Sequence, residues 1–312
     1  NVLINGDWKQ SKTVRDLDGG SDSYDCVGTQ GTSKNILTVG AVNDIPGGYE
    51  SSSDLELASF TAFGPTDDGR IKPDIVANGI SLYSTSSDSD QSYASESGTS
   101  MSSPSIAGSL ALLQQHYQAL NGNFMFSSQL KALVLHTADE AGNVGPDYRY
   151  GWGLMNVAAA AEVISHVPDD RFFYDTLENQ GDKEFTFFSR GDEEIRITIV
   201  WTDKPGQVPQ SQLNPTNRML VNDLDISLAR QVDDYIFRPY ILDPANPSKQ
   251  ARTGDNILDN VEQIHIPQPM AGFYTLQLSH KNALSGGSQP YAVVITGLDK
   301  DYIASGFIKL ED

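Results

Sequence analysis

The chain has 312 residues, of which 38% are hydrophobic and 20% are charged, a balance that excludes a disordered protein and favours a packed globular one. Its formal net charge of −20 excludes an electrostatic attraction to the phosphates of nucleic acids, although an excess of carboxylates is compatible with calcium sites. The single cysteine, Cys26, excludes an intrachain disulfide, and no apolar run reaches the length of a membrane span.

The first part of the chain alternates strand-like and helix-like patterns. Residues 35–42 (NILTVGAV) form a short apolar run between turn signals, which predicts a strand buried on both faces, and 71–79 (IKPDIVANG) is a shorter apolar segment. The Ser/Asp-rich stretch 84–92 is expected to be an exposed loop. Helices are predicted over 105–120, 127–138 and 155–167. Strands with interspersed helices indicate an α/β layer structure for residues 1–167.

After Pro168 the helical pattern ends and short strands follow. In the segment EIRITIVWTD (194–203), apolar residues alternate with polar ones, which predicts a strand with one apolar face. That face consists of Ile195, Ile197, Ile199 and Trp201. Similar segments are 220–229, 261–269, 272–281 and 291–298. Short strands separated by Gly, Pro and Asn turns indicate an antiparallel β-sandwich or jelly roll over residues 168–312.

Ser100 lies in the segment SESGTSMSSPSIAG (95–108), where the backbone is expected to turn from a loop into a helix. A glycine two residues before Ser100 permits a tight turn, and the apolar helical pattern begins directly afterwards. Free N–H groups and the dipole at a helix N-terminus favour negative charge, which develops in the transition state of acyl transfer. Ser100 is therefore a candidate nucleophile. The alternative is that Thr99 or Ser100 only caps the helix.

Four segments resemble, in the same chain order, those of the subtilisin-like serine proteases, or subtilases. Residues 98–108 (GTSMSSPSIAG) resemble the family's nucleophile motif, which runs Gly-Thr-Ser-Met-small-small-Pro into a helix. The other three segments are 35–42, 59–79 and 145–160, and the resemblance covers most of residues 25–165. It implies a partial subtilisin-like three-layer α/β/α domain over residues 1–167, and a bacterial serine endopeptidase that uses Ser100 as nucleophile.

The second part of the chain carries a resemblance of its own. The segments VWTDKPG, LVNDLDISL, DNVEQIHIP and GFYTLQLSHK resemble the β-sandwich that follows the catalytic domain in one branch of bacterial subtilases. A jelly roll after a subtilase domain is also the arrangement of the proprotein convertases, in their P domain. The resemblance therefore implies a jelly-roll domain over residues 168–312.

A subtilase also needs a histidine base and an aspartate that orients it, and in this family both precede the serine. All five histidines lie after Ser100, and the family's His-Gly-Thr and Asp-Thr-Gly or Asp-Ser-Gly motifs are absent. His136 lies in a helix that the family also has, where the resemblance implies a structural role. The simplest explanation is that the chain is the C-terminal portion of a catalytic domain, with the missing N-terminal fragment as partner. We expect no peptide hydrolysis by the chain alone.

Three further site residues follow from the resemblance. Asn5, in VLINGD, is the candidate for the oxyanion-hole asparagine; the family's Ala-Gly context is absent, and an Asn-Gly turn is the alternative. Gly28 lies in a segment, CVGTQGTSKN, that resembles the wall of the family's S1 pocket. Thr99 occupies a family position whose main role is to position the serine.

The chemistry of such an enzyme requires no cofactor, but a structural Ca²⁺ is a separate expectation. Calcium often braces secreted subtilases, and it prefers oxygen ligands. Asp223 and Asp225 are the best candidate pair, because they share one face of their strand if that strand is regular. The alternative is that these carboxylates are solvated or accept hydrogen bonds in turns.

Two functions remain open at this point. The resemblance implies protein or peptide substrates and a bacterial enzyme that is secreted or held at the cell surface. The competing hypothesis is a non-catalytic extracellular or cell-surface module, derived from a subtilase, whose sandwich binds protein or carbohydrate. The two hypotheses are separated by comparing the N-terminal sequence of the protein with its open reading frame. Asp and His motifs encoded upstream of Asn1 would support the enzyme hypothesis.

Overall fold

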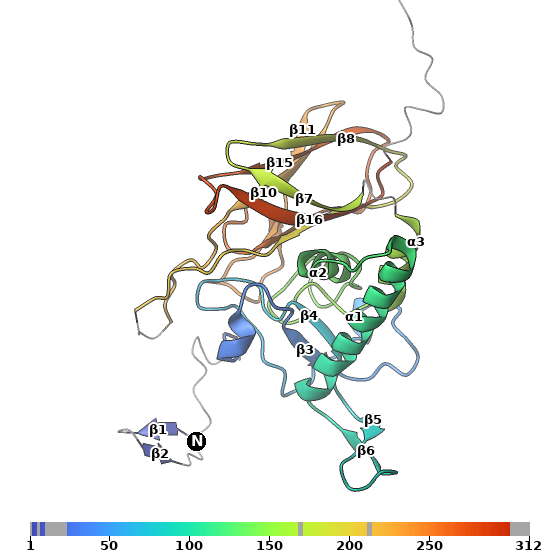
Figure 1. Ribbon diagram of the computed structural model, residues 1–312, viewed down its shortest axis with the longest axis vertical. Helices are drawn as coiled ribbons and strands as arrows, with labels where there is room; N and C mark the ends of the chain where they lie inside the picture. Colours follow the sequence, from blue (N-terminus) through green and yellow to red (C-terminus); the bar gives the residue numbers. More distant parts are fainter. Residues whose placement is uncertain (1, 5–6, 10–23, 168–170, 211–213, 300–312) are drawn as a thin grey trace, which may run out of the picture.

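The structure is a computed structural model that describes residues 2–4, 7–9, 24–167, 171–210 and 214–299 (Figure 1). Near the N-terminus, β1 (Val2–Ile4) and β2 (Asp7–Lys9) form an antiparallel hairpin. The predicted domain boundary at Pro168 lies outside the described residues. The division into residues 1–167 and 168–312 therefore stays a prediction.

The first part of the chain is built on a pair of parallel strands. β3 (Val39–Val42) lies beside β4 (Ile75–Asn78), with Val39 opposite Ile75. One face of this pair packs against the three α-helices of the described residues, α1 (Thr99–Asn121), α2 (Ser127–His136) and α3 (Val157–His166). The predicted strands and helices are confirmed. Helix α1 begins six residues before the predicted start at 105, because Gly98 serves as its N-cap.

The opposite face of β3 and β4 has a different cover. Val42 and Val76 pack there against Leu55, Ala141 and Tyr150, which belong to connecting segments. No α-helical residue of the described chain belongs to this cluster. Of the two helical layers that the resemblance implies, the described residues thus contain one.

A β-hairpin precedes α1. β5 (Leu82–Thr85) pairs with β6 (Tyr93–Glu96), and Leu82 lies opposite Glu96. The predicted loop over 84–92 is exposed, and its first two residues belong to β5. Two short 3₁₀ helices, η1 (Thr29–Thr32) and η2 (Ser52–Asp54), complete this part.

The second part of the chain forms two antiparallel four-stranded sheets. One sheet has the order β14-β9-β16-β7 and the other β11-β10-β15-β8. The strand bounds are β7 (Phe172–Glu178), β8 (Lys183–Ser189), β9 (Ile195–Trp201), β10 (Leu224–Arg230), β11 (Tyr235–Phe237), β14 (Val261–Ile266), β15 (Gly272–His280) and β16 (Ser288–Thr296). The short strands β12 (Tyr240–Ile241) and β13 (Arg252–Thr253) pair with each other.

The alternation predicted for β9 decides how the two parts meet. Its apolar face joins the core between the two sheets, and that face consists of Ile195, Ile197, Ile199 and Trp201, all fully buried. Val200, on the other face, belongs instead to the core that contains α2. The sheet with β9 and β16 thus lies against α2, above the helices in Figure 1. The two parts share one continuous apolar core.

His136 connects the two parts of the chain at this junction. It lies at the end of α2 and is buried, and its Nδ1 and Nε2 lie 3.0 Å from the hydroxyl oxygens of Thr198 and Thr296, respectively. Burial lowers its pKa well below the usual value, so the ring is neutral. These contacts fit the structural role that the resemblance implies. No helix in the described part of the chain is long and apolar enough to cross a membrane.

Candidate active site

Ser100 lies in the first turn of α1. Gly98 is the N-cap, and neither Thr99 nor Ser100 caps the helix through its side chain. The capping alternative is therefore wrong for both residues. The Ser100 side chain is exposed, and its hydroxyl has no hydrogen-bond partner among the described residues. A serine in this position is free to act on a bound molecule.

A close contact of two glycines fixes this turn against the sheet. The Gly98 N–H donates to the Gly79 carbonyl at 2.8 Å, directly after β4. A Cβ atom on Gly79 would lie 2.5 Å from the Cβ of Ala41 and 2.9 Å from the Gly98 carbonyl oxygen. Only glycine at position 79 permits this approach. The contact places Ser100 at the carboxyl ends of β3 and β4.

The start of α1 also supplies hydrogen-bond donors. The Gly98 carbonyl accepts from Met101 N at 2.9 Å, while the N–H of Ser100 has no acceptor among the described residues. Such unpaired N–H groups carry the positive end of the helix dipole. A carbonyl oxygen near Ser100 would meet a donor suited to its developing negative charge.

A groove runs beside Ser100. It has a volume of about 520 Å³ and lies between the β5–β6 hairpin and the first turns of α1. Leu82, Ala94 and Met101 give it apolar walls, while Glu96 contributes a carboxylate. The sequence interpretation missed Glu96, because it predicted an exposed loop over 84–92 but no hairpin around that loop. Pairing of Leu82 with Glu96 brings these residues to one face of the hairpin.

No histidine assists Ser100 within the described residues, which include all five histidines. His116 bonds to Ser165 at 2.8 Å, and His166 pairs with Glu162 at 2.9 Å. His136 is held at the junction, His265 pairs with Glu194 at 2.8 Å, and His280 bonds to the Asn282 carbonyl. Among the described residues, the candidate nucleophile thus has no histidine base.

The other predicted site residues are more scattered. Thr99 directly precedes Ser100, and its carbonyl accepts from the Ser102 hydroxyl at 3.1 Å, which ties the first turn together. Gly28 is exposed next to η1 and does not line the groove beside Ser100. Asn5 lies outside the described residues. The structure therefore brings together Thr99 and Ser100 from this set.

A buried ionic cluster lies at the opposite end of β4 from Ser100, directly before the strand begins. Asp74 pairs with Lys72 at 2.5 Å and Lys131 at 2.7 Å, and it accepts from Thr38 N at 2.7 Å. Burial by itself would raise the pKa of Asp74, but the Lys131 and Lys72 ammonium groups outweigh it and lower the pKa. Burial lowers the pKa of Lys72 to about 8. This cluster anchors α2 to the start of β4.

The candidate calcium pair, Asp223 and Asp225, surrounds a lysine. The Lys281 ammonium lies 3.2 Å from Asp223, 2.6 Å from Asp225 and 2.6 Å from Asp255. Asp223 also pairs with Arg218 at 2.7 Å. Among the described residues there is no group of three or more His, Cys, Asp or Glu side chains arranged to hold a metal ion. In this structure the protein's own cations neutralise the two aspartates.

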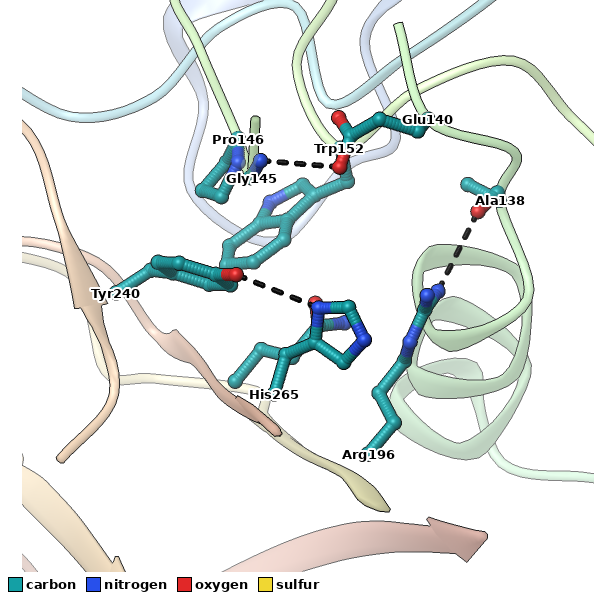
Figure 2. A pocket seen from close by; sticks show the side chains of 9 residues that line it. Ala138, Glu140, Gly145, Pro146, Trp152, Arg196, Tyr240 and His265 are labelled. Carbon is teal, nitrogen blue, oxygen red and sulfur yellow. Dashed lines mark hydrogen bonds between the residues drawn. The ribbon is translucent and has the colours of Figure 1, made fainter. Parts of the chain in front are cut away.

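A second group of titratable side chains lies in a small pocket at the junction (Figure 2). Figure 2 shows Tyr240, His265 and Arg196 from the second part facing Glu140 and Trp152 from the first. The Glu140 carboxylate accepts from Gly145 N at 3.0 Å, and burial raises its pKa. The cavity has a volume of about 20 Å³, which holds one water molecule. It is a packed joint, too small for a substrate.

Comparisons with known proteins agree with the resemblance. Residues 18–153 match the model of the subtilase family. Subtilisin DY from Bacillus licheniformis is 33% identical over 144 residues, which are 46% of this chain and 43% of that protein. C5a peptidase from Streptococcus pyogenes is 29% identical over 218 residues, which are 67% of this chain and 18% of that protein. The chain thus spans less than half the length of either relative.

A solved structure also matches at low similarity. The crystal structure of fervidolysin from Fervidobacterium pennivorans, described as a keratinolytic enzyme related to subtilisin, aligns with a TM-score of 0.35 and 13% identity. The alignment covers 87% of this chain and 51% of that one.

Proposed function

Residues 18–153 belong to the subtilase family, and from this premise we propose that the chain is the C-terminal portion of a serine endopeptidase whose nucleophile is Ser100. The observation that supports the proposal most is the setting of Ser100. Its hydroxyl is exposed beside a groove, and a free main-chain N–H lies at the same turn. The substrate class that fits is a protein or peptide bound in that groove.

The chemistry follows from this setting. The Ser100 Oγ attacks the peptide carbonyl carbon, and the oxyanion that forms accepts a hydrogen bond from the Ser100 N–H. The hydroxyl proton passes through a histidine to the leaving amine as the C–N bond breaks, and water then hydrolyses the ester. The histidine and its orienting aspartate are supplied from the upstream part of the domain. The isolated chain is therefore inactive.

The long helix supports this need for an upstream partner. Helix α1 buries Ile106 and Leu113 on one side, while Ala107, Gly108, Ala111 and Leu112 are exposed on another. The Leu112 side chain is 62% exposed, and a Cβ atom on Gly108 would meet nothing within 4 Å. A face of small and apolar residues is suited to close packing. We propose that the missing N-terminal fragment covers it.

A fluorophosphonate probe tests the nucleophile. The protein is produced with its upstream segment, either as one chain or as two co-expressed fragments. Ser100→Ala is expected to abolish labelling and casein hydrolysis. Ser103→Ala, an exposed serine on the same helix, is the matched control and should keep both. Equal labelling of the parent and Ser100→Ala would sink the assignment.

Charge placed on the exposed face of α1 tests the partner. Ala111→Arg is expected to block recovery of activity from co-expressed fragments, because it places a charge in the proposed contact. The circular dichroism of the isolated chain should not change, since Ala111 is exposed. Thr186→Arg, which adds the same charge at an exposed position on β8, is the control. Full recovery of activity with Ala111→Arg would contradict the proposed contact.

The second part of the chain is proposed to be a jelly roll. Counting its eight main strands in chain order, the sheets have the orders 1-8-3-6 and 2-7-4-5, which is the strand order of two interleaved Greek keys. The subtilase resemblance further suggests a bacterial protein that is secreted or held at the cell surface. Fractionation of the source cells, with immunoblotting of medium and envelope, tests the location.

A further inference from the structure

The chain has a second groove, which lies at the opposite end of α1 from Ser100. It has a volume of about 490 Å³ and lies between the end of α1, the start of α2 and strand β7. We call it the aromatic groove and define it by Tyr117, Asn123, Phe124, Phe126, Gln129 and Tyr174. Helix α1 has 23 residues, so the two grooves are separated by roughly 30 Å.

The loop that carries the aromatic groove is held in place by hydrogen bonds. The Gln114 amide brackets Met125, donating to its carbonyl at 3.0 Å and accepting from its N–H at 2.9 Å. Gly122 ends α1 in the left-handed conformation, with φ of 75°. The groove is therefore formed before any ligand arrives, which lowers the entropic cost of binding.

Exposed aromatic rings line the aromatic groove. Phe124 is 66% exposed and Phe126 is 58% exposed. The Phe126 ring stacks on Tyr174 of β7, with centroids 4.2 Å apart and an interplanar angle of 22°. This stack joins the first part of the chain to the second. The stack presents a flat, exposed apolar surface whose hydration is unfavourable.

The polar groups of the aromatic groove are amides and hydroxyls. Gln129 is 5% exposed, and its Oε1 accepts from Phe126 N at 3.0 Å, which fixes the amide and leaves its Nε2 donor without a partner among the described residues. Asn123 and the Tyr174 hydroxyl add further donors and acceptors. Among the described residues, no charged side chain lines the groove, although the whole chain has a net charge of −20. This composition suits a neutral ligand rich in hydroxyl groups.

The neighbouring strand argues against an extended peptide as the ligand. β7 is an edge strand, and an edge can accept an added strand. However, the Asp175 carboxylate accepts from Thr176 N at 2.7 Å and pairs with Lys183 at 3.0 Å. A charged side chain thus occupies the hydrogen-bonding edge, which blocks strand addition.

We propose that the aromatic groove binds a neutral saccharide chain. The C–H faces of a sugar ring stack on Phe126 and Phe124, while its hydroxyls bond to the amides of Gln129 and Asn123. This binding is independent of the nucleophile, because Ser100 lies at the opposite end of α1. It is a property of the chain as it stands, with or without an upstream partner.

Calorimetric titration with neutral hexasaccharides tests the proposal. The probes are cellohexaose, maltohexaose and chitohexaose, with polygalacturonate as the anionic comparison. At least one neutral probe is expected to bind saturably. Phe126→Ala should weaken that binding by about tenfold or more, since it removes half of the stack. Ser100→Ala should leave it unchanged.

Matched variants keep the test selective. Phe60→Ala and Tyr235→Ala remove aromatic rings that are 45% and 56% exposed and lie outside the aromatic groove. Both are expected to bind like the parent, and circular dichroism checks that every variant is folded. Phe124→Ala provides a second ring inside the groove if Phe126→Ala unfolds. Failure of all three neutral probes, equal loss with Phe60→Ala, or equal binding of polygalacturonate would each overturn the proposal.

Discussion

Glu262 is a fully buried carboxyl group between the sheets of the second part. Its Oε2 accepts from Ile226 N at 2.8 Å, while Oε1 has no partner among the described residues. Burial raises its pKa well above the usual value, and the negative charge of Asp225 adds to the effect. A buried carboxyl group that stays neutral lowers the free energy of unfolding at any pH at which the same group would be ionised in water.

Replacement of this carboxyl by an amide is expected to stabilise the chain. The raised pKa of Glu262 favours the folded state below the unfolded value of 4.5, and this advantage is lost as the pH rises. Glu262→Gln should therefore raise the free energy of unfolding at pH 8 by about 1 kcal/mol, with a smaller gain at pH 4. Urea unfolding at both pH values measures this, with exposed Glu184→Gln as control. Destabilisation at pH 8 would contradict it.

The Lys281 ammonium group lies between three carboxylates, where it balances their negative charge. Burial opposes its charge, but hydrogen bonds to Asp225 and Asp255 outweigh burial and raise its pKa. Burial in turn raises the pKa of Asp225 to about 6. A calcium ion bound by the same three carboxylates would have to displace the Lys281 ammonium group.

Removal of that ammonium group separates the two possibilities. Lys281→Met is expected to lower the free energy of unfolding by about 1–3 kcal/mol, because it leaves the carboxylates facing one another. Added CaCl₂ should then restore much of the loss in the variant, since Ca²⁺ accepts several oxygen ligands. The melting temperature of the parent should not respond to CaCl₂ or to EGTA. A large response of the parent would show that calcium already binds.

At the scale of elements, two glycines, one beside the start of α1 and one within that helix, have opposite surroundings. Gly79 touches Ala41 and Gly98, whereas Gly108 faces open space on α1. Gly79→Ala is expected to destabilise the isolated chain by about 1–3 kcal/mol, because its new Cβ has no room. Gly108→Ala should stabilise it by about 0.5–1 kcal/mol, because alanine is the better helix former. Chemical unfolding of the two variants compares them directly, and a similar change in both would refute the packing described.

The elements were largely predictable from the sequence, and the contacts between distant ones were not. Alternation in β9 predicted its buried face correctly, because period-two patterns report local burial. The turn from a loop into α1 was predicted from a local motif around Ser100. Glu96 was missed, because its place in the groove depends on hairpin pairing with Leu82. The lysine between Asp223 and Asp225 was missed because 56 residues separate Lys281 from Asp225.

At the scale of the whole molecule, His136 at the junction is expected to make the stability depend on pH. His136 is buried and neutral, and its pKa lies well below the unfolded value of 6.5. At a pH between the folded-state and unfolded-state pKa values of His136, the imidazole binds a proton in the unfolded state but not in the folded state. The free energy of unfolding therefore falls as the pH decreases below about 6.5. The loss from one such group reaches at most about 1.4 kcal/mol per pH unit.

A variant without the imidazole should lose this slope. His136→Gln is expected to flatten the dependence of the unfolding free energy on pH between 5 and 7, even though it destabilises the chain at pH 7. Equilibrium urea unfolding at pH 5, 6 and 7 provides the three points. His116→Gln, at a half-buried position hydrogen-bonded to Ser165, is the control and should keep the slope of the parent. An unchanged slope in His136→Gln would refute the assignment.

The shared core has a consequence for how the chain can be divided or recombined. Phe172, Val200, Val261, Ala292 and Val294 lie in the same cluster as Leu133 and Ile106. A cut between the two parts would leave these apolar side chains in water on both products, so each product is expected to aggregate. We therefore expect that the β-sandwich of a related protein could not replace residues 171–299 without disturbing this shared core. A substitution on the sheet that faces α2 is therefore expected to alter the packing of α2, which shares this core with α1, the helix that carries Ser100.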